Sequence, residues 1–524
     1  MQKKILLFVV LISNFIIAHE TCPIIPKPVS AVIIDSGYFL FNRNTILVNQ
    51  SPEDSLFSFF NDELKARMMF KKEAGDKRNS NSIIILNFDK NLGNEAYQLI
   101  VKTDKIEVKA GGKAGLFYGL VSLFQIIDAG ESIKGKGIKI NCWNIDDNPR
   151  YKWRGFMLDE ARHFFGVEKV KQVLNWMGYY KLNRFHWHLT DAQGWRITID
   201  AYPKLAEIGG IGNFSDPKAA VKYYSKADIK EIIAYAKERN IEVIPEIDMP
   251  GHATAANKAY PEFNGGGSEE YPNFTFNPGI EKTYTYLNTI IHEVDDLFPS
   301  NMIHLGGDEV SFGAQAWNTD QNVKKLIEKH SLYNIQEVEH YFFRRMADSV
   351  YKSGNKVLAW DEAADSNIPT KNSLLFWWRH DKPEQLQKAL NKGYQVVLCP
   401  RLPLYFDFVQ DSSHTVGRKW NKQYNSLNEV YNFPNGNKYY SDPLVVGIQA
   451  NLWSETIFDK SRLDFMLFPR IAALAEAAWT IEENKNFSDF SNSLKKDLNK
   501  YKRDKIKYYN PFYPNSTKEK TKPK

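Results

Sequence analysis

The chain has 524 residues, more than one ordinary hydrophobic core accommodates, so we expect two or three domains. Hydrophobic residues make up 43% and charged residues 25%, a composition that is typical of a globular protein and excludes a disordered chain. The net charge is +6, but much of the excess lies in Lys3, Lys4 and the lysines of 518–524. Because these lysines form no concentrated basic stripe, we expect no nucleic-acid partner.

The first residues have the pattern of an export signal. Lys3 and Lys4 give a positive start, a mostly apolar stretch runs from Ile5 to Ile17, and Ala18 is a small residue suited to cleavage. We therefore predict a signal peptide over 1–18 and an exported protein, in the periplasm, at the cell surface or outside the cell. No later segment approaches about 20 apolar residues, so we expect no transmembrane segment in the mature chain.

Residues 19–147 are predicted to form a smaller α+β domain. Short β-rich runs at 82–86, 97–101 and 106–108 are followed by a helical pattern over 115–127. No catalytic constellation occurs in this region, which indicates a non-catalytic, structural role.

From residue 148 onward strands and amphipathic helices alternate, a pattern typical of βα units around a parallel sheet. Helices are expected at 167–181, 226–240, 281–297, 334–353 and 382–392, and strands near 154–159, 183–189, 241–248, 302–309, 356–362, 373–378, 394–399 and 445–452. This order predicts a (β/α)8 TIM barrel over 148–482. Since the fifth and sixth strands leave no room for a full helix between them, an open doubly wound sheet is the alternative. A further helix and a lysine-rich tail are predicted for 483–524.

Polar and indole side chains gather at the predicted strand ends, where a barrel carries its chemistry. Each strand end delivers a carboxylate, an arginine, a histidine or a tryptophan, in the segments 154–163, 186–196, 246–252, 304–309, 360–362, 377–379, 405–407 and 451–455. A single residue of this kind is usually an ion-pair partner or a helix cap. Eight such strand ends in succession indicate a functional site.

Two enzymatic chemistries fit these residues. Carboxylates for proton transfer and tryptophan walls fit glycoside hydrolysis, whereas His186-x-His188 with His252, His304 and Asp308 resembles the ligands of a metal-dependent hydrolase. The tryptophans favour a sugar over a hydrated ion, so no metal or other cofactor is expected and the metal-dependent hydrolase remains the alternative. A sugar-binding protein without catalysis is a third possibility, disfavoured because binding alone does not need two adjacent acids.

The adjacent pair Asp308-Glu309 is the most informative feature. Retaining glycosidases place two carboxyl groups about 5–5.5 Å apart, and inverting ones about 6.5–9.5 Å apart, on opposite sides of the scissile bond. Neighbouring residues cannot easily straddle a bond. They can act together if one donates a proton and the other orients a nucleophile carried by the substrate, such as a 2-acetamido group.

The block His304-Leu305-Gly306-Gly307-Asp308-Glu309, together with those at 154–164, 186–196, 246–253 and 451–455, resembles family 20 glycoside hydrolases, the β-N-acetylhexosaminidases. The resemblance implies a non-catalytic domain before a (β/α)8 barrel. It also implies exo-acting, retaining hydrolysis of terminal β-linked N-acetylhexosamine from oligosaccharides or glycoconjugates. The nucleophile would be the substrate's own acetamido group.

The resemblance also implies a role for each matching residue. Glu309 would be the general acid/base, Asp308 would hold the acetamido nitrogen, and Tyr405 would bond the acetamido oxygen. The remaining assignments are Arg154 for the 3- and 4-hydroxyls, Glu455 and Asp407 for the 4- and 6-hydroxyls, Trp360, Trp378 and Trp453 for the walls with Trp377 as the alternative to Trp378, and Asp191 and His252 as supporting residues. Arg162 and Arg196 are interpreted as ion-pair partners of Asp159, Glu246 and Asp248, and His163, His186 and His188 as core or supporting histidines.

Overall fold

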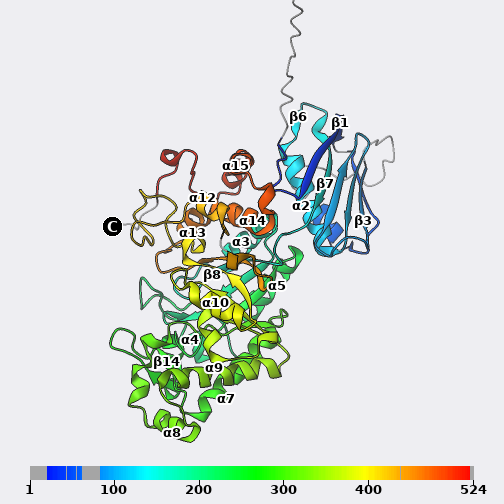
Figure 1. Cartoon of the computed structure of the whole chain (residues 1–524). Helices are drawn as coiled ribbons and strands as arrows, with labels where there is room; N and C mark the ends of the chain where they lie inside the picture. Colours follow the sequence, from blue (N-terminus) through cyan, green and yellow to red (C-terminus); the bar gives the residue numbers. More distant parts are fainter. Residues whose placement is uncertain (1–20, 43, 55, 62–82, 437, 520–524) are drawn as a thin grey trace, which may run out of the picture.

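The computed structural model describes residues 21–519 except 43, 55, 62–82 and 437, so the predicted signal peptide lies outside the described residues. Two large hydrophobic cores are present, one in the N-terminal region and one in the remainder of the chain. The N-terminal sheet stands beside the larger, mostly helical body that follows it (Figure 1). Among the described residues, none of the helices has the length and apolar character that a membrane crossing requires.

The N-terminal domain is a mixed sheet with the strand order β1-β7-β4-β5-β3-β2, with β6 (Glu131–Ile133) paired to β7. Its strands are β1 (Ser30–Phe41), β2 (Ile46–Asn49), β3 (Ile83–Phe88), β4 (Tyr97–Val101), β5 (Lys105–Ala110) and β7 (Gly137–Asp147). Burial alternates along β4 and β5, because every second side chain packs toward helix α2 (Lys113–Ala129). The β-rich runs and the helix predicted here are therefore confirmed.

Eight parallel strands close into a barrel, so the open doubly wound sheet is wrong. The barrel strands are β8 (Trp153–Asp159), β9 (Arg184–His188), β12 (Glu242–Glu246), β15 (Met302–His304), β16 (Lys356–Trp360), β17 (Ser373–Trp377), β18 (Gln395–Leu398) and β19 (Val445–Leu452). The ring closes where β19 pairs with β8 and β9 pairs with β12. In this order β12 and β15 lie across the barrel from β18 and β19.

Helices cover the outside of the barrel. They include α3 (Val167–Tyr179), α5 (Lys226–Glu238), α7 (Glu281–Leu297), α9 (Ile335–Lys352), α10 (Pro383–Asn391) and α14 (Arg470–Trp479). The start of α5 is fixed by a capping box, in which Ser225 and Asp228 each bond the other's backbone N–H. Between β16 and β17 there are only two 3-10 turns, η4 (Asp361–Ser366) and η5 (Thr370–Asn372), which explains the short spacing in the sequence.

The C-terminal segment contacts both the helices and the loops of the barrel. Helix α15 (Phe487–Arg503) lies next to the N-terminal domain (Figure 1), and Asp497 on it accepts hydrogen bonds from Tyr179 and Tyr180 of the barrel. Farther along, Glu519 accepts hydrogen bonds from the backbone of Thr415 and Val416 at 2.7 and 3.0 Å. The predicted lysine-rich tail is thus packed against the barrel as far as residue 519.

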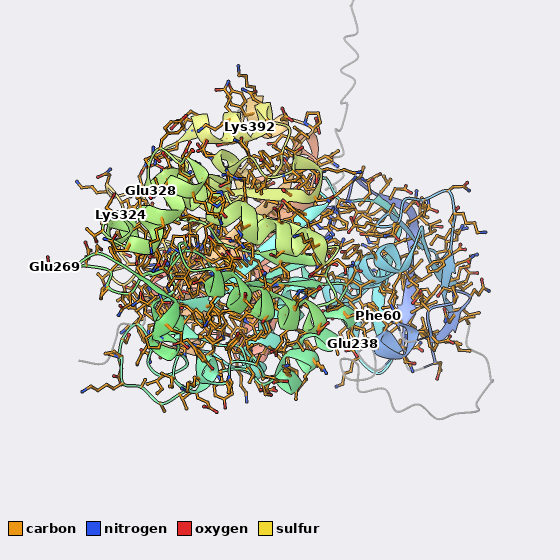
Figure 2. All side chains as sticks on the ribbon, turned by 90° about the horizontal axis from the view of Figure 1, so that it is seen from below. Phe60, Glu238, Glu269, Lys324, Glu328 and Lys392 are labelled. Carbon is orange, nitrogen blue, oxygen red and sulfur yellow. The ribbon has the colours of Figure 1, made fainter. Side chains whose placement is uncertain are left out.

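The interface between the N-terminal domain and the barrel is extensive. Phe60 of the N-terminal domain and Arg239, which follows Glu238 at the end of α5, line one small cavity (Figure 2), and the Arg239 guanidinium lies 5.1 Å from the centroid of the Phe59 ring. Trp479 at the end of α14 donates a hydrogen bond of 2.9 Å to Asp147 on β7. The N-terminal domain therefore packs firmly against the barrel.

Candidate active site

The two adjacent acids lie on a turn beyond the end of β15. The strand was predicted over 302–309 but ends at His304, and the turn places Gly306, Gly307 and Glu309 at φ values of 66°, 89° and 52°. A Cβ at Gly306 would lie 1.8 Å from Asp248 Oδ1, so only glycine fits there. Side chains of neighbouring strand residues point to opposite faces, whereas this left-handed turn brings both acids to the same face.

Asp308 and Glu309 both meet His252. The His252 Nε2 atom lies 3.6 Å from Asp308 Oδ2 and 3.8 Å from Glu309 Oε2. The Asp308 side chain is 11% exposed and the Glu309 side chain 34% exposed, so Glu309 is the acid nearer to solvent. The two carboxylates therefore lie beside the same imidazole nitrogen.

His252 is positively charged in this setting. Its Nδ1 atom lies 3.1 Å from Asp191 Oδ1. Burial lowers the pKa of His252, but the carboxylates of Asp191 and Asp308 outweigh this effect and raise it to about 9. Burial also tends to raise the pKa of Asp191, but Arg162 and His252 hold it well below its ordinary value. Asp191 and His252 thus lie where a supporting pair was predicted.

A buried network continues beneath this pair. His188 lies between two carboxylates, with Nε2 2.8 Å from Asp191 Oδ2 and Nδ1 2.5 Å from Glu246 Oε2. Glu246 also accepts a hydrogen bond of 2.9 Å from Trp360 Nε1, and His186 Nε2 and His304 Nδ1 each lie 3.0 Å from it. Burial lowers the pKa of His188, but Glu246 and Asp191 raise it well above the ordinary value.

Three groups of these residues have ligand atoms close enough to hold a metal ion, within 4.8 Å of one another: His186, Glu246 and His304; His188, Asp191 and Asp248; and Asp248, His252 and Asp308. In the first group, His186 Nε2 and His304 Nδ1 each lie 3.0 Å from the Glu246 carboxylate. In the other two groups the histidines have a different use. The cationic His188 and His252 are donors between carboxylates, and a protonated imidazole has no lone pair left for a metal. This geometry fits a network that supports the adjacent acids.

Aromatic side chains line the carboxyl ends of the strands that follow β15 around the barrel, from β16 to β19. The rings of Trp378 and Tyr405 are nearly parallel, with centroids 6.4 Å apart and planes inclined by 12°, and Trp453 lies 6.1 Å from Tyr405 and 5.8 Å from Trp360. Trp377 instead contacts Tyr440, 6.0 Å away, on the outer side of the strand. Trp378 is therefore the indole that joins the wall. Burial raises the pKa of Tyr405 well above its ordinary value, so its hydroxyl remains a hydrogen-bond donor.

Asp407 and Glu455 meet on the other side of the barrel, after β18 and β19, and Arg418 joins them. Its Nε lies 2.8 Å from Asp407 Oδ2 and its Nη2 lies 2.7 Å from Glu455 Oε1. Burial raises the pKa of Asp407 to about 7, and Arg418 opposes this shift. Arg418 was not predicted from the sequence, because the interval 408–444 has no clear pattern. Its backbone N–H bonds to the carbonyl oxygen of Asp407, which brings this arginine to the site.

The prediction for Arg154 is wrong. This residue lies at the amino end of β8, fully buried at the interface with the N-terminal domain, away from the carboxyl ends of the strands. Its guanidinium donates hydrogen bonds to the carbonyl oxygens of Lys181 and Tyr151, to Tyr118 Oη and to Glu95. Arg154 therefore holds the two domains together, at the end of the barrel away from the acids.

Arg162 occupies the position that Arg154 was expected to fill. It follows the carboxyl end of β8 and lies 5.1 Å from the centroid of the Trp453 ring, with Nη2 2.6 Å from Asp191 Oδ2. Its Nη1 donates to Asp159 Oδ2 at 3.3 Å and its Nε to Gln193 Oε1 at 3.0 Å. Each terminal nitrogen keeps one further N–H for a ligand. The predicted strand over 154–159 already argued against Arg154, because it places this residue at the amino end of the strand, whereas a barrel carries its active site at the carboxyl ends.

Glu362 is a further acid that had no predicted role. It accepts a hydrogen bond of 3.1 Å from Trp378 Nε1, and its pKa is raised well above the ordinary value by burial, by Asp361 and, more weakly, by Asp308. The site is therefore rich in carboxylates, and the cations Arg162, His188 and His252 lie among them.

A closed βα barrel that presents paired acids, a basic hydroxyl-binding group and an indole wall at its carboxyl end has the architecture of a glycoside hydrolase. Residues 151–482 match the catalytic domain of glycosyl hydrolase family 20, and residues 21–148 match domain 2 of the same family. The chain belongs to glycosyl hydrolase family 20. This membership decides between the two predicted chemistries in favour of glycoside hydrolysis.

Individual relatives agree with this result. A β-hexosaminidase of Porphyromonas gingivalis is 31% identical over 490 residues, which are 90% of this chain and 62% of that protein. A β-hexosaminidase of Vibrio furnissii is 32% identical over 480 residues, 87% of this chain and 76% of that protein. The solved exo-β-N-acetylglucosaminidase of Vibrio harveyi, in complex with N-acetylglucosamine, gives a TM-score of 0.84 at 31% identity, covering 94% of this chain and 79% of that one. The chain thus spans about three-fifths of the first relative's length.

Proposed function

We propose that the protein is an exo-acting β-N-acetylhexosaminidase. It removes terminal, non-reducing β-linked N-acetylhexosamine from oligosaccharides or glycoconjugates, with retention of configuration and with the substrate's 2-acetamido group as nucleophile. One observation carries this proposal: Asp308 and Glu309 converge on His252 Nε2, at 3.6 and 3.8 Å. Both acids lie on one turn beside the same histidine, so we infer that Glu309 handles the proton and that the nucleophile comes from the substrate.

In the first step Glu309, the more exposed acid, donates its proton to the glycosidic oxygen. The bond from C1 to that oxygen breaks, the leaving group departs as an alcohol, and the acetamido oxygen bonds to C1 to form an oxazolinium ion. In the second step Glu309 takes a proton from water. The water oxygen attacks C1, and the bond from C1 to the acetamido oxygen breaks, which opens the oxazolinium ring. The acetamido group and the proton of Glu309 are thereby restored, and C1 keeps its configuration after two inversions.

Asp308 and Tyr405 orient the acetamido group. Asp308 accepts a hydrogen bond from the acetamido nitrogen, which becomes positively charged in the oxazolinium ion. Burial and the neighbouring Asp248 raise the pKa of Asp308, while His252 lowers it. The ionised form of Asp308 is therefore stabilised most when the nitrogen carries its charge, which favours the transition state over the bound substrate. Tyr405 donates its proton to the acetamido oxygen.

The non-reducing end of the sugar lies toward β8, β18 and β19. Arg162 offers its free N–H groups to the 3- and 4-hydroxyls, and Asp407 and Glu455 accept from the 4- and 6-hydroxyls. Arg418 bridges the two acids, with distances of 2.8 and 2.7 Å. In this arrangement the three side chains would leave no room for a further sugar on the 4-hydroxyl, as exo-cleavage requires. The Vibrio harveyi relative was solved with N-acetylglucosamine, which supports this sugar as a substrate.

The experiment compares two nitrophenyl glycosides. The purified protein should release nitrophenol from the β-N-acetylglucosaminide and leave the plain β-glucoside intact, because glucose carries a hydroxyl where the acetamido nucleophile is needed. Equal rates on both substrates would show that the acetamido group has no part in the reaction.

We propose in addition that the protein is exported, on the strength of Lys3, Lys4, the apolar stretch from Ile5 to Ile17 and Ala18. Sequencing the amino terminus of the protein purified from its native host should give a chain that begins shortly after Ala18. A mature chain that begins at Met1 would contradict export by this signal.

A further inference from the structure

The order of the strands in the barrel indicates on which side of the proposed sugar site the leaving group would lie. Asp407 and Glu455 follow β18 and β19, and β12 and β15 lie across the ring from these strands. A sugar whose 4- and 6-hydroxyls meet Asp407 and Glu455 therefore points its C1 toward β12 and β15. Glu309, which follows β15, lies at that end. Whatever covers the outer side of Glu309 must contact the group that leaves.

Two aromatic rings lie on that side. Phe312 follows Glu309 in the 3-10 turn η2 (Val310–Phe312), its N–H bonds to the Glu309 carbonyl oxygen at 3.0 Å, and its side chain is 41% exposed. Tyr271 comes from the loop after β12, and its ring is stacked on Phe312 with centroids 5.4 Å apart and planes inclined by 19°. The pKa of Tyr271 is raised by burial, by Glu270 and also by Glu309, which puts Glu309 within electrostatic reach of its hydroxyl.

This ring pair is held in place from both loops. Tyr271 lies in a hairpin between β13 (Asn264–Gly266) and β14 (Thr275–Phe276), and its N–H bonds to Ser268 Oγ at 3.1 Å. Trp317, in the turn after Phe312, donates a hydrogen bond of 2.9 Å to Thr275 Oγ1 and so joins the two loops. This pair of an exposed Phe312 and a half-buried Tyr271, on loops that are fixed to each other, is ready for a ligand without further ordering.

Phe274 connects the pair to the catalytic residues. Its ring lies 5.6 Å from that of Tyr271 and 4.7 Å from that of His252. A Cβ at Gly313 would lie 2.6 Å from Phe274 Cβ, so the backbone after Phe312 packs directly on this ring. Ring contacts thus run without a break from His252 through the buried Phe274 to Tyr271 and to Phe312, which is exposed to solvent.

We propose that Tyr271 and Phe312 form the binding platform for a neutral pyranosyl leaving group, an inference that rests on the proposed hexosaminidase function. A pyranose ring has a flat face of C–H groups that stacks on an aromatic ring. Glu269 and Glu270, next to Tyr271, are exposed, and Glu269 lies at the edge of the molecule (Figure 2). Their carboxylates can accept hydrogen bonds from sugar hydroxyls and repel an anionic leaving group.

The test compares two substrates whose leaving groups have similar alkoxide chemistry. One is the β-linked disaccharide of N-acetylglucosamine, whose leaving group is a pyranose, and the other is methyl N-acetyl-β-glucosaminide, whose leaving group has no ring. For Phe312→Ala we expect kcat/KM on the disaccharide to fall between about 2-fold and 13-fold, the range of one aromatic stacking contact. On the methyl glycoside kcat/KM should stay within about 2-fold of the wild-type value.

Controls separate stacking from indirect effects. Phe312→Tyr keeps a flat ring and should retain the wild-type preference for the disaccharide, whereas Phe312→Leu should lose it. Tyr333→Ala, which removes a ring that is 89% exposed in the turn before α9 (Ile335–Lys352), should change neither rate. An equal loss on both substrates would overturn the platform, because Phe312 would then act through the placement of Glu309. Wild-type rates on both substrates would overturn it as well. A wild-type protein that cleaves neither substrate would instead refute the hexosaminidase function itself.

Discussion

Arg154 lies at the amino end of β8 and Arg162 beyond its carboxyl end. Replacing each in turn by methionine separates the structural role of Arg154 from the substrate-binding role of Arg162. Methionine keeps the length and the apolar stem of arginine and removes the guanidinium. Arg154→Met should destabilise the fold and leave catalysis nearly unchanged. Arg162→Met should impair catalysis and also lower stability, because it leaves the buried Asp159 and Asp191 without their cation.

The magnitude for Arg154 comes from its contacts. The guanidinium is fully buried, donates to two carbonyl oxygens and Tyr118, and pairs with Glu95 at 2.7 Å. Removing one partner of a buried ion pair costs about 3–5 kcal/mol, because the other groups stay buried without a donor. Since Glu95 is 24% exposed and can be partly rehydrated, we expect about 3 kcal/mol and a melting temperature lower by several degrees.

For Arg162 the magnitude follows from the bonds it offers to the sugar. One hydrogen bond to a charged group contributes about 1.5–3 kcal/mol, which corresponds to a loss of about 10-fold to 150-fold in kcat/KM for each hydroxyl that is no longer bound. The assay is the steady-state hydrolysis of the nitrophenyl β-N-acetylglucosaminide, with a thermal melt of each variant. If Arg154→Met raised KM at an unchanged melting temperature, our placement of the two arginines would be refuted.

Further predictions concern the acids, the supporting histidine and the role of metals. Glu309→Gln should abolish turnover of the disaccharide and leave the melting temperature nearly unchanged; wild-type rates would remove Glu309 from the mechanism. Gly306→Ala should abolish activity and destabilise the fold by at least about 1–3 kcal/mol in a urea titration, because its φ of 66° and the 1.8 Å approach to Asp248 Oδ1 exclude a Cβ. The pKa of His252 is about 9 in the folded protein and about 6.5 in an unfolded chain, so its contribution to stability is complete below pH 6.5 and is lost as the pH rises through 9. We expect kcat/KM to fall on this alkaline side, and a His252→Gln variant that kept the same alkaline limb would exclude His252 as its origin. A chelator should leave the rate unchanged, and inactivation that zinc or another divalent ion reverses would revive the metal-dependent alternative.

Much of the fold follows from the sequence, because hydrophobic periodicity fixes which segments pack. The barrel strands and helices begin and end within a few residues of the predicted positions, and the absence of a helix between β16 and β17 is readable from spacing alone. The strand at 302–309 was predicted too long, because Leu305 continues the run of apolar residues. The left-handed turn at Gly306 has no characteristic hydrophobic pattern that would mark the end of the strand. Strand β1 was missed, since most of its side chains are exposed.

The candidate site was predictable where a residue follows a strand directly or lies in the first turn after it. Trp378 follows β17 directly, and Asp308, Glu309 and His252 lie in the turns after β15 and β12, so the barrel brings them together. Arg154 was misassigned because a motif was read without the direction of its strand. Arg418 could not be found, since it reaches Asp407 through a long loop, and the bonds that fold this loop back join residues without any sequence pattern.

The match to the catalytic domain stops at residue 482, yet the rim of the pocket depends on the chain far beyond it. Glu519 accepts hydrogen bonds from the backbone N–H groups of Thr415 and Val416. Arg418 lies two residues beyond Val416, and its guanidinium contacts both Asp407 and Glu455. Proteolysis just after α15 would leave the acids and tryptophans of the active site in place, but it would remove the segment that carries Glu519 and with it the contact to the loop of Arg418. Such a trimmed enzyme should keep its chemistry and lose grip on the far end of the sugar, so the length of the carboxyl terminus is itself a determinant of substrate affinity.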